Sequence, residues 1–361
     1  MKDKLPVTFS SFISGKNSFD FLRFFFAFSV FVYHFRLFTG TKMYFPISGP
    51  MAVAGFFIIS GFLIMRSYYR STGLTDFAIK RIRRIVPAYF FVVIACAFFF
   101  SLISSFSFSQ YFGSKTFFKY LAANLCFLNF IQPVLPGVFT TNMLPYVNGS
   151  LWTIKVELAL YASIPLIALL LKRKPIFVLI GLYFISFVFV YYMNYLYGIT
   201  GNRLYFTLSA QFLGQIQFLT SGIIILFYFD FLRKQMKFFL SFSVIIFLSN
   251  YFIPFPVIAF LYPFAFAILI VFFAYYFKQL ACFSKYGDFS YGMYLFHYPV
   301  IQLIIHFGWF KENKIVFFLM SFMMTLFLSV LSWHLLEKRF LTKKRLHAVY
   351  DETREKNKNN I

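Results

Sequence analysis

Long apolar segments alternate with short polar ones along nearly the whole chain. A helix needs about 20 mostly apolar residues to cross the hydrocarbon core of a bilayer. Ten segments approach or meet this requirement: 20–38, 47–66, 85–106, 150–171, 176–197, 204–228, 237–254, 257–277, 288–309 and 315–336. The pattern therefore predicts an all-α integral membrane protein with about ten transmembrane helices.

The polar segments predict how this membrane part is organised. We expect a single membrane domain over 1–340 and a short charged tail over 341–361. The longest polar segment is 107–149, and within it 117–132 is apolar but too short to span, which indicates an interfacial or re-entrant piece. The first 23 residues are basic and polar with no short apolar core before a cleavage site, so no removable signal peptide is predicted.

Composition and charge support a membrane protein and predict its orientation. Of 361 residues, 60% are hydrophobic and 12% are charged, against about 25% charged in soluble domains, which excludes an ordinary soluble enzyme. The net charge of +23 could indicate nucleic acid, but the basic residues lie in short runs between apolar segments. With ten spans, 25 of the 34 basic residues lie on the side of the N-terminus and six on the other. The positive-inside rule then places both termini in the cytoplasm and 107–149 outside.

Two ionisable residues lie on the first predicted span, where such groups are costly and often functional. Arg23 and His34 are eleven residues apart, so they share a helix face with an axial separation of about 16 Å. This spacing favours an elongated substrate, with an anionic group at Arg23 and a reacting group at His34. The alternative is an arginine that reaches the membrane surface and a structural histidine.

The second span and the segment after it carry two further features. Ser60 and Gly61 interrupt an apolar helix, which indicates either a close helix contact through small residues or a kink that opens a cavity. Four cations then precede the third span: Lys80, Arg81, Arg83 and Arg84. They could bind a polyphosphate group or anchor the chain on anionic lipid.

The fourth span begins with a polar run. Ser150 is predicted to cap this helix, and Glu157 shares a face with Tyr161 four residues later. A buried carboxylate can orient a histidine and stabilise its charged form during general-base catalysis. A structural pair between Glu157 and Lys155 is the alternative.

The last two spans carry a further histidine and a carboxylate. His297 lies near the middle of the ninth span, which Asp288 and Ser290 are suited to start. We expect His297 to line the same cavity as His34. Glu337, at the end of the tenth span, can pair with a basic inner segment.

The other histidines and the cysteines suggest no chemistry. His306 and His334 are interpreted as packing or edge residues. Cys96, Cys126 and Cys282 are far apart and show no metal-ligand spacing, so they are interpreted as buried packing thiols, and no metal is expected.

Taken together, six segments resemble acyltransferase family 3, the polytopic membrane O-acyltransferases that modify bacterial surface glycans. The resemblance runs from Phe19 to about Phe340. Its segments, in order, are Arg-x10-His at Arg23 and His34, GFFIISGFLI at 55–64, FAIKRIRRIVPAY at 77–89, SLWTIKVELALYASIP at 150–165, GDFSYGMYLFHYP at 287–299 and LLEKRF at 335–340. Ala54 stands where the family usually has a polar residue.

The resemblance implies an activity and its two substrates. Acyl-CoA, most often acetyl-CoA, would bind from the cytoplasm as a co-substrate, and no bound cofactor is implied. The acceptor would be a hydroxyl of a surface polysaccharide such as the O-antigen of lipopolysaccharide, or its lipid-linked precursor, on the outer side of the bacterial inner membrane.

The resemblance also implies roles for individual residues. Arg23 and the four cations Lys80, Arg81, Arg83 and Arg84 would hold the donor phosphates. His34 would be the general base, with Glu157 as its partner. The residues expected to line the cavity are Ser60, Gly61, Trp152, Tyr161, Ser290, Tyr291 and His297.

Three other functions fit parts of the sequence. A proton-coupled transporter could use His34, Glu157 and His297 as a proton relay, although transporters often contain inverted repeats and we find no internal repeat. A channel or assembly scaffold needs no chemistry at these positions. An acyltransferase with a non-glycan acceptor is the third. No nucleic-acid partner is expected, and the sequence carries no signal for an oligomeric state.

Overall fold

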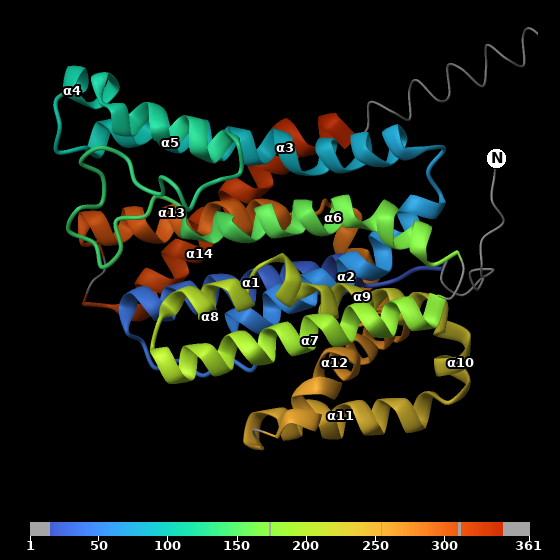
Figure 1. Cartoon of the computed structure of the whole chain (residues 1–361). Coiled ribbons are helices and arrows are strands. Elements are labelled where there is room, and N and C mark those ends of the chain that lie inside the picture. Colours follow the sequence, from blue (N-terminus) through green and yellow to red (C-terminus); the bar gives the residue numbers. More distant parts are fainter. Residues whose placement is uncertain (1–14, 173–174, 254, 310–311, 342–361) are drawn as a thin grey trace, which may run out of the picture. The chain divides into compact units, whose positions relative to one another are not determined.

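The computed structural model describes residues 15–172, 175–253, 255–309 and 312–341. These residues form helices and connecting segments, with no strand among them. In order, the helices are α1 (Phe19–Thr39), α2 (Gly49–Tyr69), α3 (Leu74–Phe99), η2 (Phe100–Ile103), α4 (Phe108–Gly113), α5 (Lys115–Leu125), η3 (Gly149–Leu151), α6 (Trp152–Leu170), α7 (Pro175–Thr200), α8 (Arg203–Ser209), α9 (Phe212–Phe227), α10 (Phe229–Lys234), α11 (Met236–Phe252), α12 (Pro256–Tyr276), η4 (Lys278–Lys285), α13 (Ser290–Phe307), α14 (Lys314–Ser332) and η5 (Trp333–Glu337). Figure 1 shows their arrangement. The predictions for the first 14 residues and for the tail over 342–361 lie outside the described residues.

Within the described residues, eight helical segments are long and apolar enough to cross a membrane. They are α1, α2, α3 with η2, η3 with α6, α7, α8 with α9, α12, and the segment Lys314–Leu341, which contains α14 and η5. The other two predicted spans fall on α11, which has only 17 residues, and on α13, whose apolar character is lowered by His297 and Gln302. The prediction of a helical multi-pass membrane protein is therefore confirmed, whereas the count of ten and the side of each terminus stay predictions.

Contacts divide the described chain into two compact units. Unit 1 contains 15–30, 44–74 and 153–286, and unit 2 contains 31–43, 75–152 and 287–341. Helix α1 begins in unit 1 and ends in unit 2. Each unit is therefore assembled from segments that are far apart in the sequence.

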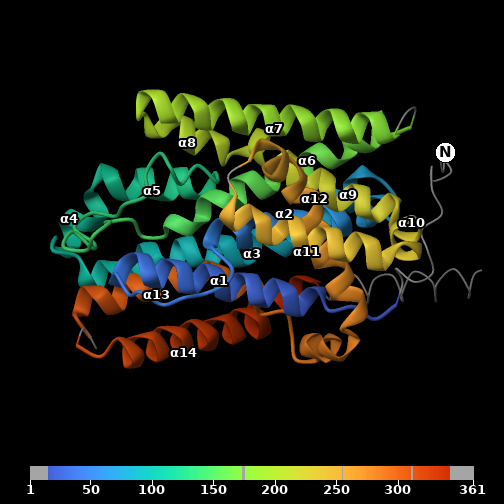
Figure 2. The same ribbon diagram turned by 90° about the horizontal axis from the view of Figure 1, so that it is seen from below.

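Unit 1 is built around a close contact between α2 and α9, which Figures 1 and 2 both show side by side. Gly61 of α2 faces the backbone carbonyl of Leu219, and Gly222 of α9 faces the carbonyl of Ile58, so neither glycine has room for a Cβ atom. Glycines at such positions let two helix backbones approach closely. Of the two alternatives for the Ser60–Gly61 pair, this geometry favours the close helix contact.

Unit 2 pairs α13 with α14. Gly292 lies against Ser329, where an added Cβ would come within 2.8 Å of the Ser329 Cα. In the segment 107–149, the Tyr111 hydroxyl of α4 donates a hydrogen bond of 2.7 Å to the carbonyl of Ala97. Burial raises the pKa of the Tyr111 phenol, so it stays a neutral donor and holds this segment against the end of α3.

The helix cap predicted at Ser150 is wrong. Asn148 is the capping residue, and its Oδ1 accepts from the Ser150 backbone N–H at 3.3 Å. The chain first forms the short 3-10 turn η3, and α6 starts at Trp152. Asn hydrogen-bonds to its own backbone two residues on more readily than Ser, and this turn precedes the helix.

The cysteine prediction holds for one residue of three. Cys96 is buried within α3, whereas Cys126 and Cys282 are exposed. Cys126 ends α5 and Cys282 lies in the 3-10 helix η4. Neither therefore sits in the middle of a long apolar helix, where burial was expected.

Candidate active site

Two histidines from distant parts of the sequence meet inside unit 2. The Nδ1 atom of His34, on α1, lies 3.0 Å from the Nε2 atom of His297, on α13. His297 is fully buried, and its Nδ1 atom lies 3.2 Å from the backbone carbonyl oxygen of Met293. The sequence predicted that both histidines line one cavity, and the structure places them in direct contact.

These contacts assign the protons on both rings. A carbonyl oxygen only accepts, so Nδ1 of His297 carries the proton that it donates to Met293. A fully buried imidazole is costly to charge, so its Nε2 atom holds a lone pair and accepts from Nδ1 of His34. In the neutral His34 ring, Nε2 then holds the lone pair, and this nitrogen is the one able to act as a general base.

The helix that carries His297 is held by residues just before α6. The side-chain amide of Asn148 donates a hydrogen bond of 2.8 Å to the carbonyl of Leu295. The Tyr294 hydroxyl donates one of 3.0 Å to the carbonyl of Ser150. These bonds hold α13 at its second turn, which stabilises the position of the buried His297 ring.

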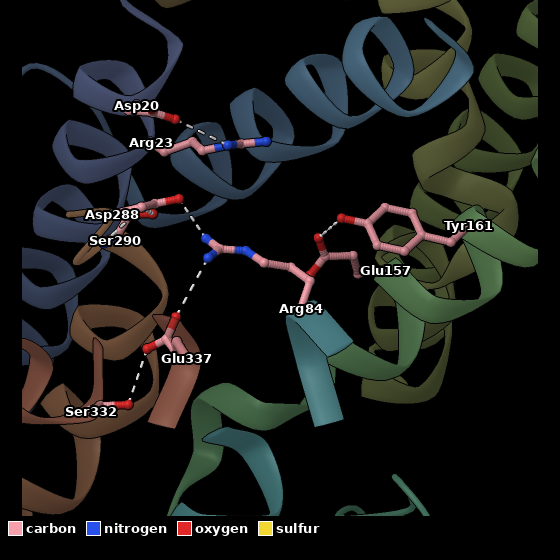
Figure 3. A network of polar contacts seen from close by, with 9 residues as sticks. All are labelled: Asp20, Arg23, Arg84, Glu157, Tyr161, Asp288, Ser290, Ser332 and Glu337. Atoms are coloured by element: carbon pink, nitrogen blue, oxygen red, sulfur yellow. Dashed lines mark hydrogen bonds and ion pairs between the residues drawn. The ribbon is translucent and has the colours of Figure 1, made fainter. Parts of the chain in front are cut away.

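A partly buried ionic network joins α3, the start of α13 and η5 (Figure 3). The guanidinium of Arg84 lies 2.5 Å from a carboxylate oxygen of Asp288 and 3.5 Å from one of Glu337. Ser290 donates to the second oxygen of Asp288 at 2.5 Å, and Ser332 donates to the second oxygen of Glu337 at 3.0 Å. Glu337 is only 2% exposed, and its predicted pairing with a basic segment is confirmed by the contact with Arg84.

Two of the other three cations of this predicted cluster have partners nearby on α3. Lys80 forms an ion pair of 2.7 Å with Asp76, and the Arg81 guanidinium lies 5.9 Å from the centre of the Phe77 ring. Arg83 is half-buried. These contacts fix three of the four cations against the protein, while their role in donor binding stays a prediction.

Tyr291, one of the residues expected to line the cavity, lies beside the same network. Its ring centre is 5.7 Å from the Arg84 guanidinium, and its hydroxyl donates a 2.9 Å hydrogen bond to the carbonyl of Ile85. Tyr291 therefore ties the start of α13 to α3.

Three further predicted site residues, Arg23, Glu157 and Tyr161, lie in unit 1. Arg23 forms an ion pair of 3.3 Å with Asp20, one turn earlier on α1. Glu157 accepts a hydrogen bond from the Tyr161 hydroxyl on the same face of α6, as the spacing predicted. Trp152 is the first residue of α6 and belongs to unit 2. The catalytic role of Glu157 and the donor-binding role of Arg23 stay predictions.

Sequence reasoning missed two contributors. Asp288 was expected only to start α13, which it does by accepting from the Ser290 backbone N–H at 3.2 Å, but it is also the nearer partner of Arg84. Asn148, which holds α13, carried no signal beyond its place in a polar run. Both partners are about 150 to 200 positions away in the chain, and no local pattern reveals such a pairing.

Residues 16–334 match acyltransferase family 3, described as an acyltransferase domain. The chain belongs to this family, and its membership together with the apolar helices defines a multi-pass membrane O-acyltransferase.

Two known proteins are similar to the chain in sequence. The chain is 28% identical over 329 residues to an "O-acetyl transferase" of Shigella phage Sf6, which covers 83% of this chain and 87% of the phage protein. It is 30% identical over 169 residues to "Nodulation protein 10" of Rhizobium leguminosarum bv. viciae, covering 44% of this chain and 46% of that protein. No solved structure matches the chain.

Proposed function

We propose that this protein transfers an acetyl group from acetyl-CoA to a hydroxyl of a surface glycan, such as O-antigen or its lipid-linked precursor, at the bacterial inner membrane. The observation that carries the proposal is the contact of 3.0 Å between His34 and the buried His297. The name of the phage relative supports the acetyl group, and the Arg23–His34 spacing supports a long donor with an anionic end.

The histidine pair supplies the general base. Nε2 of His34 takes the proton of the acceptor hydroxyl as its oxygen attacks the thioester carbonyl of the donor. The tetrahedral intermediate collapses, the C–S bond breaks, and the proton passes from His34 to the CoA thiolate. When His34 becomes an imidazolium, its Nδ1–H is still held by the lone pair of His297, which stabilises the charged ring. General-base help of this kind accelerates transfer by about 10²–10⁴-fold.

The donor is proposed to enter from the cytoplasmic side, on which the positive-inside rule places both termini. Arg23 is near the start of α1, and His34 is about 16 Å further along the same helix. A CoA molecule bound with its phosphates at Arg23 would extend its pantetheine arm toward His34. Lys80, Arg81 and Arg83 would add positive charge at the entrance, and Glu157 would act with His34.

A proton-coupled transporter is the second candidate, because two histidines in contact can also exchange protons. It predicts flux that depends on a proton gradient and no acylated product. Membership of an acyltransferase family favours the first function.

The experiment that tests the proposal compares surface glycans from cells that carry the native gene, the His34→Ala form and the His334→Ala form. His334 is an exposed histidine of η5, so its replacement is the matched control. Mass spectrometry and proton NMR would detect a base-labile ester. We expect the ester with the native and His334→Ala proteins and its loss with His34→Ala. Equal modification by all three, with each protein shown to be in the membrane, would overturn the mechanism.

A further inference from the structure

Unit 2 contains a cavity of about 480 Å³ at the C-terminal ends of α1 and α13, the helices that carry the histidine pair. Its size is typical of sites for small organic ligands. Its walls come from the end of α1, the segment before α6, the end of α13 and the start of α14. The residues that matter for its chemistry are Phe38, Asn142, His306, Phe307, Trp309 and Lys314. The cavity thus combines aromatic rings with amide, imidazole and ammonium groups.

The aromatic wall is built by the end of α13. Gly308 ends the helix with a φ of 67°, a left-handed conformation that favours glycine. The backbone N–H groups of Gly308 and Trp309 donate back to the carbonyls of Ile305 and Ile304 at 2.9 and 3.2 Å. This turn stacks the rings of Phe307 and Trp309 with centres 4.7 Å apart and planes at 16°, although both side chains are about half exposed.

The polar groups of the cavity are also held in place. The Asn142 side-chain N–H₂ donates to the backbone and side-chain oxygens of Gln302, at 3.0 Å each. The Nδ1 atom of His306 is buried and has no hydrogen-bond partner within the part of the chain that the structure describes. A buried polar atom of this kind normally has a partner. His306 also lines the cavity, and an imidazole is a group that can form a hydrogen bond with a ligand hydroxyl.

One aromatic residue separates this cavity from the base. The ring of Phe38, which lines the cavity, is 6.4 Å from the ring of His34 and 5.1 Å from that of Tyr298. Phe38 is one helical turn after His34 on α1. A molecule seated in the cavity would therefore have its inner end close to the histidine pair.

We propose that this cavity binds the acceptor sugar, with one pyranose ring on the Phe307–Trp309 stack and its hydroxyls on Asn142 and His306. This inference rests on the proposed function. A sugar ring presents apolar C–H faces and a polar edge, which is the combination that aromatic rings and fixed polar groups recognise. The orientation of α1 proposed above opens the cavity to the outer side, opposite the donor.

The test uses purified full-length protein with acetyl-CoA and, as the acceptor, unmodified glycan extracted from cells that carry the His34→Ala form. Three variants are compared with the native protein: Trp309→Ala, Trp309→Phe and Tyr44→Ala. Tyr44 is an 88% exposed aromatic residue outside the cavity, so it is the matched control. Detergent-solubilised yield and size-exclusion profile show whether each variant folds.

We expect Trp309→Ala to raise the apparent KM for the glycan about three- to tenfold, as loss of one aromatic contact predicts. The apparent KM for acetyl-CoA should stay within about twofold, Trp309→Phe should restore most of the acceptor affinity, and Tyr44→Ala should behave as the native protein. An unchanged glycan KM in Trp309→Ala would overturn the acceptor site, and so would an equal rise in Tyr44→Ala. If the native protein acylates no glycan at all, the proposed function fails first.

Discussion

Replacing Arg84 tests whether this cation mainly holds the protein together or mainly binds the donor. In Arg84→Met, the carboxylates of Asp288 and Glu337 lose a guanidinium at 2.5 and 3.5 Å. Breaking a buried ion pair by removing one partner costs about 3–5 kcal/mol. The side chains of Arg84 and Asp288 are 20% and 12% exposed, so solvent screens part of this loss, and we expect about 2–4 kcal/mol.

The expected loss is large enough to measure as a melting temperature. At about 2–4 °C per kcal/mol for a domain of this size, Arg84→Met should lower the apparent Tm by about 5–15 °C. The assay is fluorescence-detected size exclusion of the heated protein in detergent. Arg83→Met, which replaces the neighbouring arginine, should change the stability by less than about 0.5 kcal/mol.

A double-mutant cycle separates the ion pair from other effects of the substitution. Glu337→Gln removes one charge and keeps the hydrogen bond from Ser332. The double variant Arg84→Met/Glu337→Gln should be about 1–2 kcal/mol more stable than the sum of the two single losses predicts. The reason is that Glu337→Gln removes the buried carboxylate charge that Arg84→Met leaves without its partner. The reasoning is refuted if Arg84→Met has the same Tm as Arg83→Met and the apparent KM of Arg84→Met for acetyl-CoA rises. Arg84 would then act on the donor.

Three further predictions concern the base, the donor and the packing of unit 1. His297→Ala should lower kcat about 10²-fold by removing the acceptor that sets the tautomer of His34, and His297→Gln should recover part of the rate. Arg23→Ala should raise the apparent KM for acetyl-CoA about tenfold with little change in the glycan KM. Gly61→Val should destabilise the protein by about 3 kcal/mol or more, because its side chain would overlap the carbonyl of Leu219, and this is measured as the yield of folded protein.

Each of these three predictions has a measurable result that would contradict it. Equal rates for His297→Ala and the native protein would show that His34 needs no neighbour to hold its proton. An unchanged donor KM in Arg23→Ala would remove Arg23 from the phosphate site. A Gly61→Val protein of native stability would mean that α2 and α9 do not approach closely in the membrane.

The sequence alone determined the class of fold and the family. Hydrophobic length is a local property, because the bilayer sets how many apolar residues a span needs. The helices over most predicted spans could therefore be located without coordinates. The shared faces of Arg23 and His34 and of Glu157 and Tyr161 follow from the helical repeat. The family resemblance, carried by short motifs in order, was also visible before the fold.

Only the tertiary structure decided which of these residues meet. His34 and His297 are 263 positions apart, and Arg84 reaches Asp288 and Glu337 across more than 200 positions. Such pairs depend on how helices pack and rotate about their axes, which the apolar pattern of a membrane helix leaves undetermined because nearly every face is apolar. The protonation of the histidine pair follows from its contacts, and the cavity beside Trp309 follows from the packing of α1, α13 and α14. Both became visible only when the helices were placed together.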